Sequence, residues 1–281
     1  MNPQRIETLF LRTLLPGILL SGSVLSFQLS PQVQSSDSTA PAPPPDPVTD
    51  LLAQANDLAQ NRFDNKKALA LYSEALLLES ANSEILWRIS RSYIEIGEHL
   101  PTLSDEDKEE QLRMYEKGLE FADRSVAANP MSSMAFTTRA IARGRVALFT
   151  GLWGSVGMMK DIRADLHQAL AFDSTNHLAF YALGATHMKV IEKPWILRWP
   201  LGLGWGSRGR AIALFEQAIV LKWDFIGYRL ACARAYFEEG DYGRARAHLS
   251  LIPMLPTQDE DDGRYRAEAR ELLTRINSEE E

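Results

Sequence analysis

Residues 177–187 read HLAFYALGATH, and residues 211–218 read AIALFEQA. Each segment places bulky and small residues on one helical face: Phe180, Leu183, Gly184 and His187 in the first, and Ala211, Phe215 and Ala218 in the second. Small residues such as Gly184 and Ala218 let two helices approach closely, and Phe215 fills the space that remains. We therefore predict an antiparallel helix pair here, with His187 as a packing residue.

The same pattern recurs along the chain. Core positions restart at Leu52 and again at Leu86, which is 34 residues later. This period and the placement of small and bulky residues resemble a tetratricopeptide repeat. One helix pair cannot bury its apolar face alone, so neighbouring pairs must stack on it. We predict an all-α, tetratricopeptide-like helical-hairpin solenoid over residues 49–277, in which the last helix, with Ala269, Leu272 and Ile276, is a capping helix.

Several segments in a fixed order carry a narrower resemblance. They are WRISR at 87–91, YEKGLEFA at 115–122, ANP at 128–130, a glycine-rich break at 151–157, EKPW at 192–195 and AIALFE at 211–216. Together they resemble the regulator of microtubule dynamics family and are similar to the periplasmic T-component of some TRAP transporter systems. The resemblance implies a helical-repeat architecture, no enzyme activity and, by the family name, a link to microtubules.

The N-terminal part of the chain has a different composition. Residues 1–26 combine Arg5 and Arg12 with a short apolar run and small residues, which is typical of a secretory signal peptide or of an N-terminal anchor. Residues 27–48 are rich in serine and proline and predict a disordered linker. We expect a secreted or periplasmic location, with a membrane-anchored protein as the alternative. Residues 278–281 form an acidic tail.

Composition excludes some classes of function. The net charge of -7 argues against nucleic acid, whose binding proteins carry basic faces. The single cysteine, Cys232, excludes an internal disulfide and lies on an apolar face, so we interpret it as a buried core residue.

The sequence carries no pattern for catalysis, for a cofactor or for a metal. No two of its five histidines have the i, i+4 spacing of a helical zinc site, and no nucleophile motif is present. We interpret residues 97–111 as a solvated acidic loop and residues 151–157 as a flexible connection between helices.

The first helix of each pair should line a concave surface. The residues that we predict to bind a ligand or partner there are Trp87, Arg91, Met134, Tyr181, Met188, Arg234 and Phe237. The insert at 193–206 adds Trp195, Trp199 and Trp205, either as a contact surface or as a plug that folds back onto the solenoid.

These features favour a non-enzymatic adaptor or scaffold that binds a protein or peptide partner, in the cell envelope. Two alternatives stay open: an apolar small molecule bound in the lumen of the repeats, and a cytoskeleton-associated regulator. The sequence also leaves open self-association and membrane association through the N-terminus.

Overall fold

The computed structural model of the chain describes residues 46–150 and 152–279, which form a succession of helices with no strand among them. The predicted targeting segment 1–26 and most of the predicted linker lie outside the described residues. The helices are α1 (Pro47–Gln60), α2 (Asn65–Leu78), α3 (Ser83–Glu98), α4 (Asp105–Ala128), α5 (Ser133–Val146), α6 (Leu152–Phe172), α7 (His177–Ile191), α8 (Trp195–Arg198), α9 (Arg208–Leu221), α10 (Ile226–Glu239), α11 (Tyr242–Leu251), the 3-10 turn η1 (Ile252–Met254) and α12 (Asp262–Glu279).

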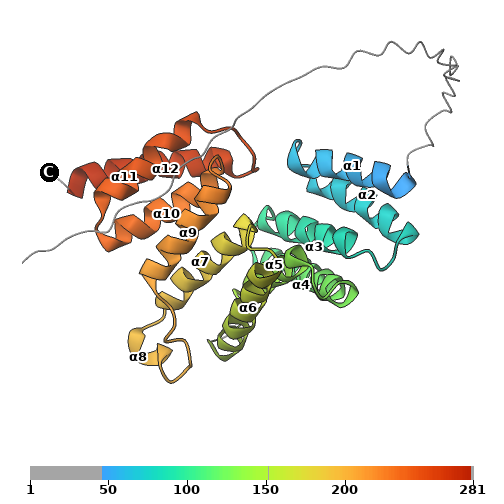
Figure 1. Cartoon of the computed structure of the whole chain (residues 1–281), viewed down its shortest axis with the longest axis horizontal. Helices are drawn as coiled ribbons and strands as arrows, with labels where there is room; N and C mark the ends of the chain where they lie inside the picture. Colours follow the sequence, from blue (N-terminus) through green and yellow to red (C-terminus); the bar gives the residue numbers. More distant parts are fainter. Residues whose placement is uncertain (1–45, 151, 280–281) are drawn as a thin grey trace, which may run out of the picture. The chain divides into compact units, whose positions relative to one another are not determined.

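These helices form stacked antiparallel hairpins, as the sequence predicts. The pairs are α1 with α2, α3 with α4, α5 with α6, α7 with α9, and α10 with α11. The second helix of each hairpin also packs on the first helix of the next one, so the described helices follow one another side by side from α1 to α12 (Figure 1). The tetratricopeptide-like helical-hairpin solenoid is therefore confirmed.

Polar side chains fix the points at which the helices begin. At eight helix starts a side-chain oxygen accepts a hydrogen bond from a backbone N–H of the first turn; the capping residues are Asp46, Asp64, Asn82, Ser104, Ser132, Asn176, Ser207 and Asp241. A capping side chain of this kind stabilises a helix by about 0.5–2 kcal/mol. The turns between hairpins are thus specified locally.

The close approach predicted for the α7–α9 pair is present. A Cβ atom added at Gly184 would lie 2.7 Å from a ring carbon of Phe215 and 3.1 Å from the carbonyl oxygen of Ala211. Phe215 is buried, together with Ala211 and Ala218, in a core that extends into α10, α11 and α12. Only a residue without a side chain fits at position 184 unless the two helices move apart.

A buried carboxylate joins α5 to α6. The Asp165 carboxylate accepts two hydrogen bonds from Arg139, at 2.9 and 2.6 Å, and one from Arg143 at 2.7 Å. The side chain of Asp165 is 6% exposed, so this ion pair is well shielded from water. A buried carboxylate needs such partners because its desolvation is costly.

Three boundaries differ from the sequence prediction. The acidic residues Asp105 and Asp107 are not in a loop: they form the first turn of α4, where Ser104 and Asp107 make a capping box and negative charge is favourable. The prediction of a flexible connection over residues 151–157 is also wrong from residue 152 onward, because α6 already begins there. The helical region also starts at Pro47, two residues before the predicted boundary, since Asp46 caps α1 and Val48 is buried.

The C-terminal helix covers the end of the solenoid. Ala269, Leu272 and Ile276 of α12 are buried against α10 and α11. The Asp262 carboxylate accepts hydrogen bonds from the backbone N–H groups of Gln258 and Asp259, at 2.7 and 3.1 Å, and so fixes the turn before α12. The structure therefore confirms the capping helix, which extends to Glu279.

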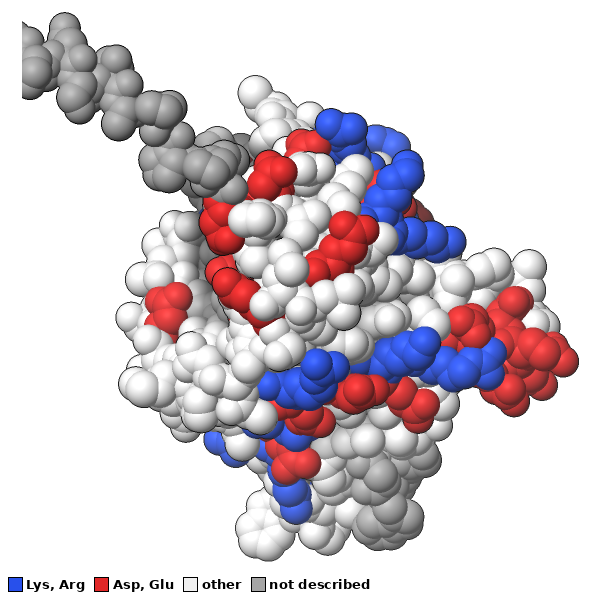
Figure 2. Space-filling model, turned by 90° about the vertical axis from the view of Figure 1, so that its right-hand side faces the viewer, with Lys and Arg blue, Asp and Glu red and all other residues white. Residues whose placement is uncertain are grey.

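The surface of the described region is charged but mixed. On the face shown in Figure 2, acidic and basic side chains lie next to one another. Ion pairs between residues close in the sequence occur in the described region, such as Arg88 with Glu84 and Lys189 with Glu192. Among the described helices, none is both long enough and apolar enough to cross a membrane.

A candidate ligand-binding chamber

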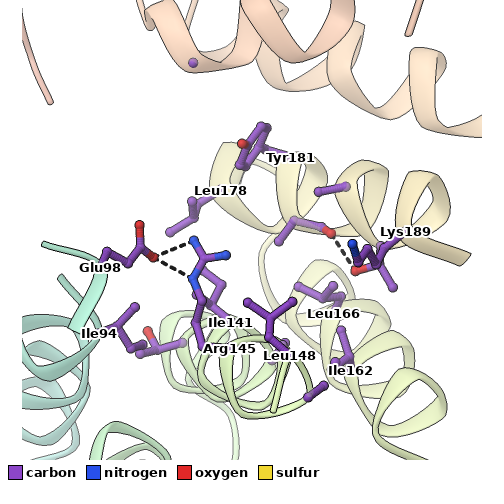
Figure 3. A pocket seen from close by; sticks show the side chains of 18 of the residues that line it. Ile94, Glu98, Ile141, Arg145, Leu148, Ile162, Leu166, Leu178, Tyr181 and Lys189 are labelled. Carbon is purple, nitrogen blue, oxygen red and sulfur yellow. Dashed lines mark hydrogen bonds and ion pairs between the residues drawn. The ribbon is translucent and has the colours of Figure 1, made fainter. Parts of the chain in front are cut away.

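A cavity of about 690 Å³ lies between α3, α5, α6 and α7 and is bordered by the segment that leads into α12 (Figure 3). Its walls are mixed: charged, hydroxyl and aromatic side chains lie beside an aliphatic part formed by Ile94, Ile141, Leu148, Met159, Ile162, Leu166 and Leu178. We call this cavity the chamber. Its size is within the range of about 300–1,000 Å³ that is usual for small-molecule sites.

Aromatic rings form one side of the chamber. Tyr181 of α7 stacks on Tyr228 of α10, with ring centroids 4.8 Å apart, and Phe225 lies 4.5 Å from Tyr228. The Tyr228 hydroxyl also lies 2.7 Å from Nδ1 of His177, so its polar end has a partner. Burial raises the pKa values of Tyr181 and Tyr228, so both phenols stay neutral. This wall offers flat, uncharged contact area.

Eight charged side chains line the chamber, four of each sign, and one pair of them bridges two hairpins. Arg145 at the end of α5 contacts the Glu98 carboxylate of α3 at 2.6 and 2.5 Å. Burial lowers the pKa of Arg145, but the Glu98 carboxylate outweighs this effect and the net pKa is raised, so the guanidinium stays charged. Lys189 and Lys193 also line the chamber, and Lys189 contacts Glu192 at 2.6 Å.

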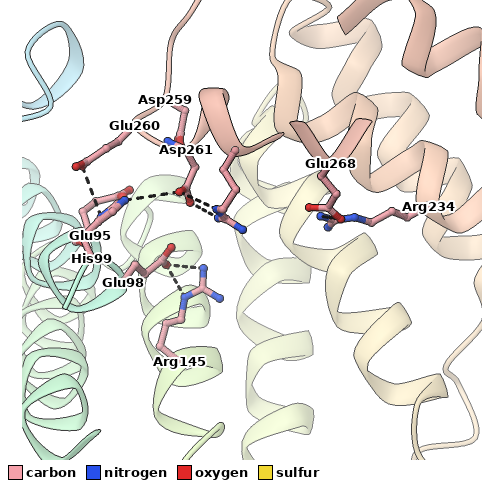
Figure 4. A network of polar contacts seen from close by, with 10 residues as sticks. Glu95, Glu98, His99, Arg145, Arg234, Asp259, Glu260, Asp261 and Glu268 are labelled. Carbon is pink, nitrogen blue, oxygen red and sulfur yellow. Dashed lines mark hydrogen bonds and ion pairs between the residues drawn. The ribbon is translucent and has the colours of Figure 1, made fainter. Parts of the chain in front are cut away.

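Contacts between distant parts of the chain lie beside the chamber, which Asp261 lines (Figure 4). Nδ1 of His99, just after α3, lies 3.5 Å from Glu260, and its Nε2 lies 3.8 Å from Asp261. Burial lowers the pKa of His99, but its bond to the Glu95 carbonyl and the two carboxylates outweigh that effect and raise it. Asp261 is held in turn by Arg264 of α12. We call this set the closing contact.

A second cavity of about 390 Å³ adjoins the chamber. The two cavities have six lining residues in common: Arg91, Glu95, Leu178, Phe225, Tyr228 and Asp259. Its other walls come from α1, α2 and α3, from the segment before α12, and from His177 and Lys222. The concave side of the solenoid is therefore hollow along more than one hairpin.

The structure brings together part of the predicted site. Arg91 and Tyr181 line the chamber, and Trp87 lines the second cavity. Met188 and Phe237 instead pack against the C-terminal core, and Arg234 pairs with Glu268 of α12. Among the described residues that line the two cavities, neither these three nor Met134 occurs. α12 lies against α10, which is why the part of the predicted surface formed by Arg234 and Phe237 is covered.

The two halves of the tryptophan-rich insert at 193–206 differ: one is exposed, as predicted for a contact surface, and the other is packed inside, as predicted for a plug. Trp195 and Trp199 are 75% and 84% exposed, on and next to the short helix α8. Trp205 packs against the central core, edge-on to the ring of His187 at 5.1 Å and beneath the guanidinium of Arg163 at 4.7 Å. The first half of the insert is thus a surface, and the second half folds back as a plug.

Several lining residues were missed from the sequence. Arg145, Glu98, Asp261 and Tyr265 line the chamber, although none was among the predicted site residues. Arg145 and Glu98 did carry a signal, because each lies eleven residues, about three helical turns, after a predicted site residue, Met134 or Trp87, and so on the same helix face. The segment before α12 carried none, since its place against α3 depends on the path of the whole solenoid.

Comparison of the sequence with known proteins shows the family of this chain. A model of the family described as Regulator of microtubule dynamics protein 1-3 matches residues 51–277. The chain belongs to this family. It is 23% identical over 235 residues to Regulator of microtubule dynamics protein 1 of Bos taurus, covering 80% of this chain and 71% of that protein. The corresponding protein of Pongo abelii is 24% identical over 233 residues, covering 81% and 72%.

Solved structures agree on the fold. A thermophilic TPR protein of Thermus thermophilus superposes with a TM-score of 0.59 at 18% identity, covering 81% of this chain and 99% of that one. PilF of Pseudomonas aeruginosa gives a TM-score of 0.50 at 11% identity, covering 83% and 90%. At these identities the likeness concerns architecture alone.

Proposed function

We propose that this member of the family binds an elongated, mostly apolar small molecule with an anionic end inside the chamber. The observation that carries the proposal is a cavity of about 690 Å³ that has one aliphatic wall and the closing contact beside it. A hollow lined with aliphatic side chains gains free energy when an apolar ligand displaces its water. No bond-making step is part of the proposal.

The character of the walls favours such a ligand over an extended peptide. A peptide brings one N–H and one C=O group per residue, and each of them needs a hydrogen-bond partner once it is buried. The lining between Ile141 and Leu166 is largely aliphatic and offers few such partners. A hydrocarbon chain makes no such demand.

One lysine gives the ligand its expected polarity. Lys189 and Lys193 line the chamber at the end of α7, and Figure 3 shows Lys189 apart from the Glu98–Arg145 pair. Arg145 is already neutralised by Glu98 at 2.6 Å. Lys189 is likewise paired, with Glu192 at 2.6 Å, whereas Lys193 has no ion pair among the described residues. A carboxylate or phosphate on the ligand would therefore meet Lys193, while its apolar part contacts Leu166 and Tyr181.

The experiment that tests this proposal is mass spectrometry of the full chain under native conditions after mild extraction. We expect an added mass that organic solvent releases as an apolar compound. Ala185→Phe narrows the chamber and should remove the added mass, whereas Ala213→Phe, on the exposed side of α9, should retain it. An unliganded wild-type protein that also takes up no added fatty acid would overturn the proposal.

A protein partner is a second candidate, and it concerns a different surface. Trp195, Ile196 and Trp199 are 75%, 64% and 84% exposed within one short segment. Exposed aromatic clusters commonly mark interfaces. We propose that an adaptor role, if present, uses this segment; a crosslinked pull-down that yields the same partner from wild type and from Trp195→Ser/Trp199→Ser would contradict that role.

The proposed location is the cell envelope, because residues 1–26 have the composition of a secretory signal or anchor. The alternative is a cytoskeletal role, for which the name of the related mammalian proteins is the motivation. A topology reporter fused to the C-terminus of the full chain separates them, since a cytoskeletal role requires cytoplasmic exposure of the helical region.

A further inference from the structure

Three side chains of different chemistry converge outside the chamber. Glu216 of α9, Cys232 of α10 and His248 of α11 each direct one atom that can bind a metal toward the others, and these atoms lie within 4.8 Å of one another. Sγ of Cys232 is 3.8 Å from Oε1 of Glu216 and 3.7 Å from Nε2 of His248, and that nitrogen is 3.1 Å from the same Oε1. None of the three lines either described cavity.

These separations match the edges of a zinc tetrahedron. Zinc binds cysteine sulfur at about 2.3 Å and histidine nitrogen or carboxylate oxygen at about 2.0–2.2 Å, almost always tetrahedrally. With tetrahedral angles, the sulfur should then lie about 3.6 Å from each of the other ligands, and the nitrogen about 3.4 Å from the oxygen. The observed triangle differs from this by a few tenths of an ångström, so a zinc ion fits after small side-chain shifts.

The surroundings orient two of the three ligands. The Tyr236 hydroxyl donates a hydrogen bond to Oε1 of Glu216 at 3.0 Å, and its ring stacks on His248 with an interplanar angle of 17°. Partners that hold metal ligands in this way commonly tune metal affinity. Nδ1 of His248 is buried and has no hydrogen-bond partner among the described residues, so stacking rather than a hydrogen bond holds the ring.

The site also has a route from solvent. Cys232 is fully buried, but the Glu216 side chain is 40% exposed and that of His248 is 13% exposed. An ion can therefore enter from the carboxylate side, and water can supply a fourth ligand there. A set of one thiolate, one imidazole and one carboxylate suits zinc better than calcium or magnesium, which prefer oxygen alone.

We propose that Glu216, Cys232 and His248 form a Zn²⁺ site that ties α9, α10 and α11 together. Burial and the neighbouring Glu216 carboxylate raise the pKa of the Cys232 thiol, so the metal-free protein holds the thiol protonated. Binding then replaces the S–H bond with a Zn–S bond and releases one proton to the solvent. In the metal-free state, the Cys232 and His248 groups instead direct hydrogen bonds to the Glu216 oxygen.

Cobalt titration of the full chain tests the site, with Co²⁺ as a spectroscopic substitute for Zn²⁺. Cys232 is the single cysteine of the sequence, so any thiolate-to-cobalt absorption band reports this site. We expect the band to saturate at one equivalent, to disappear when Zn²⁺ is added, and to be absent in Cys232→Ser. Tyr236→Phe should weaken Co²⁺ binding about 10- to 100-fold.

A matched control and a second measurement keep the test decisive. His167 is exposed on α6, and His167→Gln should bind Co²⁺ as the wild type does. If Cys232→Ser does not fold, the wild-type titration decides, together with a melting temperature that rises with Zn²⁺ and falls back with EDTA. No thiolate band in the folded wild type at excess Co²⁺, or the same band in folded Cys232→Ser, would overturn the site.

Discussion

Single residues decide how closely the hairpins pack, and Gly184 is the clearest case. The nearest neighbours of its missing Cβ are the Phe215 ring and a backbone carbonyl of Ala211, and a backbone atom cannot move alone. Phe215 is itself 2% exposed and surrounded by core residues. The space at this helix crossing is therefore fixed from both sides.

Gly184→Leu should destabilise the fold by about 1–3 kcal/mol or more, the usual cost of overpacking. Gly157→Leu is the matched control, because that helical glycine has no atom within 4 Å of its missing Cβ. Urea unfolding of both variants gives the comparison. Equal stability of the two would show that position 184 is not a tight crossing.

His187 makes stability depend on pH. Burial, with Arg163 and two further cationic neighbours, lowers its pKa from 6.5 to about 4, so the folded state binds fewer protons than the unfolded state. The contribution of the neutral ring is complete above pH 6.5 and is lost as the pH falls toward 4. We expect wild type to lose about 2 kcal/mol more than His187→Phe between pH 7 and pH 5. Parallel losses in urea unfolding would assign the pH effect to other groups.

At the scale of elements, the insert after α7 has two parts with different physical roles. Leu203 is buried and Trp205 packs on His187, so this half closes the central core. The half around α8 projects from the stack of helices (Figure 1) and exposes Trp199. A connection between helices needs no exposed tryptophan, which is why we propose a contact surface for a partner in this half of the insert alone.

Serine substitutions separate the two halves. Trp205→Ser should lower stability by about 2 kcal/mol or more, because it removes a large side chain packed on the core. Trp199→Ser should leave the melting temperature unchanged, since that ring touches mainly solvent. A comparable loss in both variants would mean that α8 is packed against another surface.

At the scale of the whole helical region, the sequence patterns predicted the features that depend on neighbouring residues alone, namely the helices and their hairpins. The hairpins follow from apolar spacing and from caps such as Asn82 and Ser132, which act within one turn. The chamber depends instead on the path of all the hairpins, which brings Asp261 to His99 although the two residues are far apart in the sequence. Glu216, Cys232 and His248 likewise meet only because α9, α10 and α11 pack against one another.

The same reasoning explains which predicted site residues reach the chamber. Arg91 and Tyr181 are on the first helices α3 and α7, and both line the chamber. Arg234 and Phe237 are on a first helix that α12 covers, where Arg234 meets Glu268 and Phe237 packs beneath Arg275. The docking position of a capping helix is a long-range property that periodicity does not encode.

The most direct test of a ligand-filled chamber is photocrosslinking of the full chain with a fatty acid that carries a photoreactive group near the end of its chain. We predict that mass spectrometry will locate the crosslinks on chamber residues such as Ile141, Leu166 and Tyr181, and that Ala185→Phe will abolish them. Crosslinks confined to Trp195 and Trp199, or crosslinks that Ala185→Phe leaves unchanged, would contradict the account.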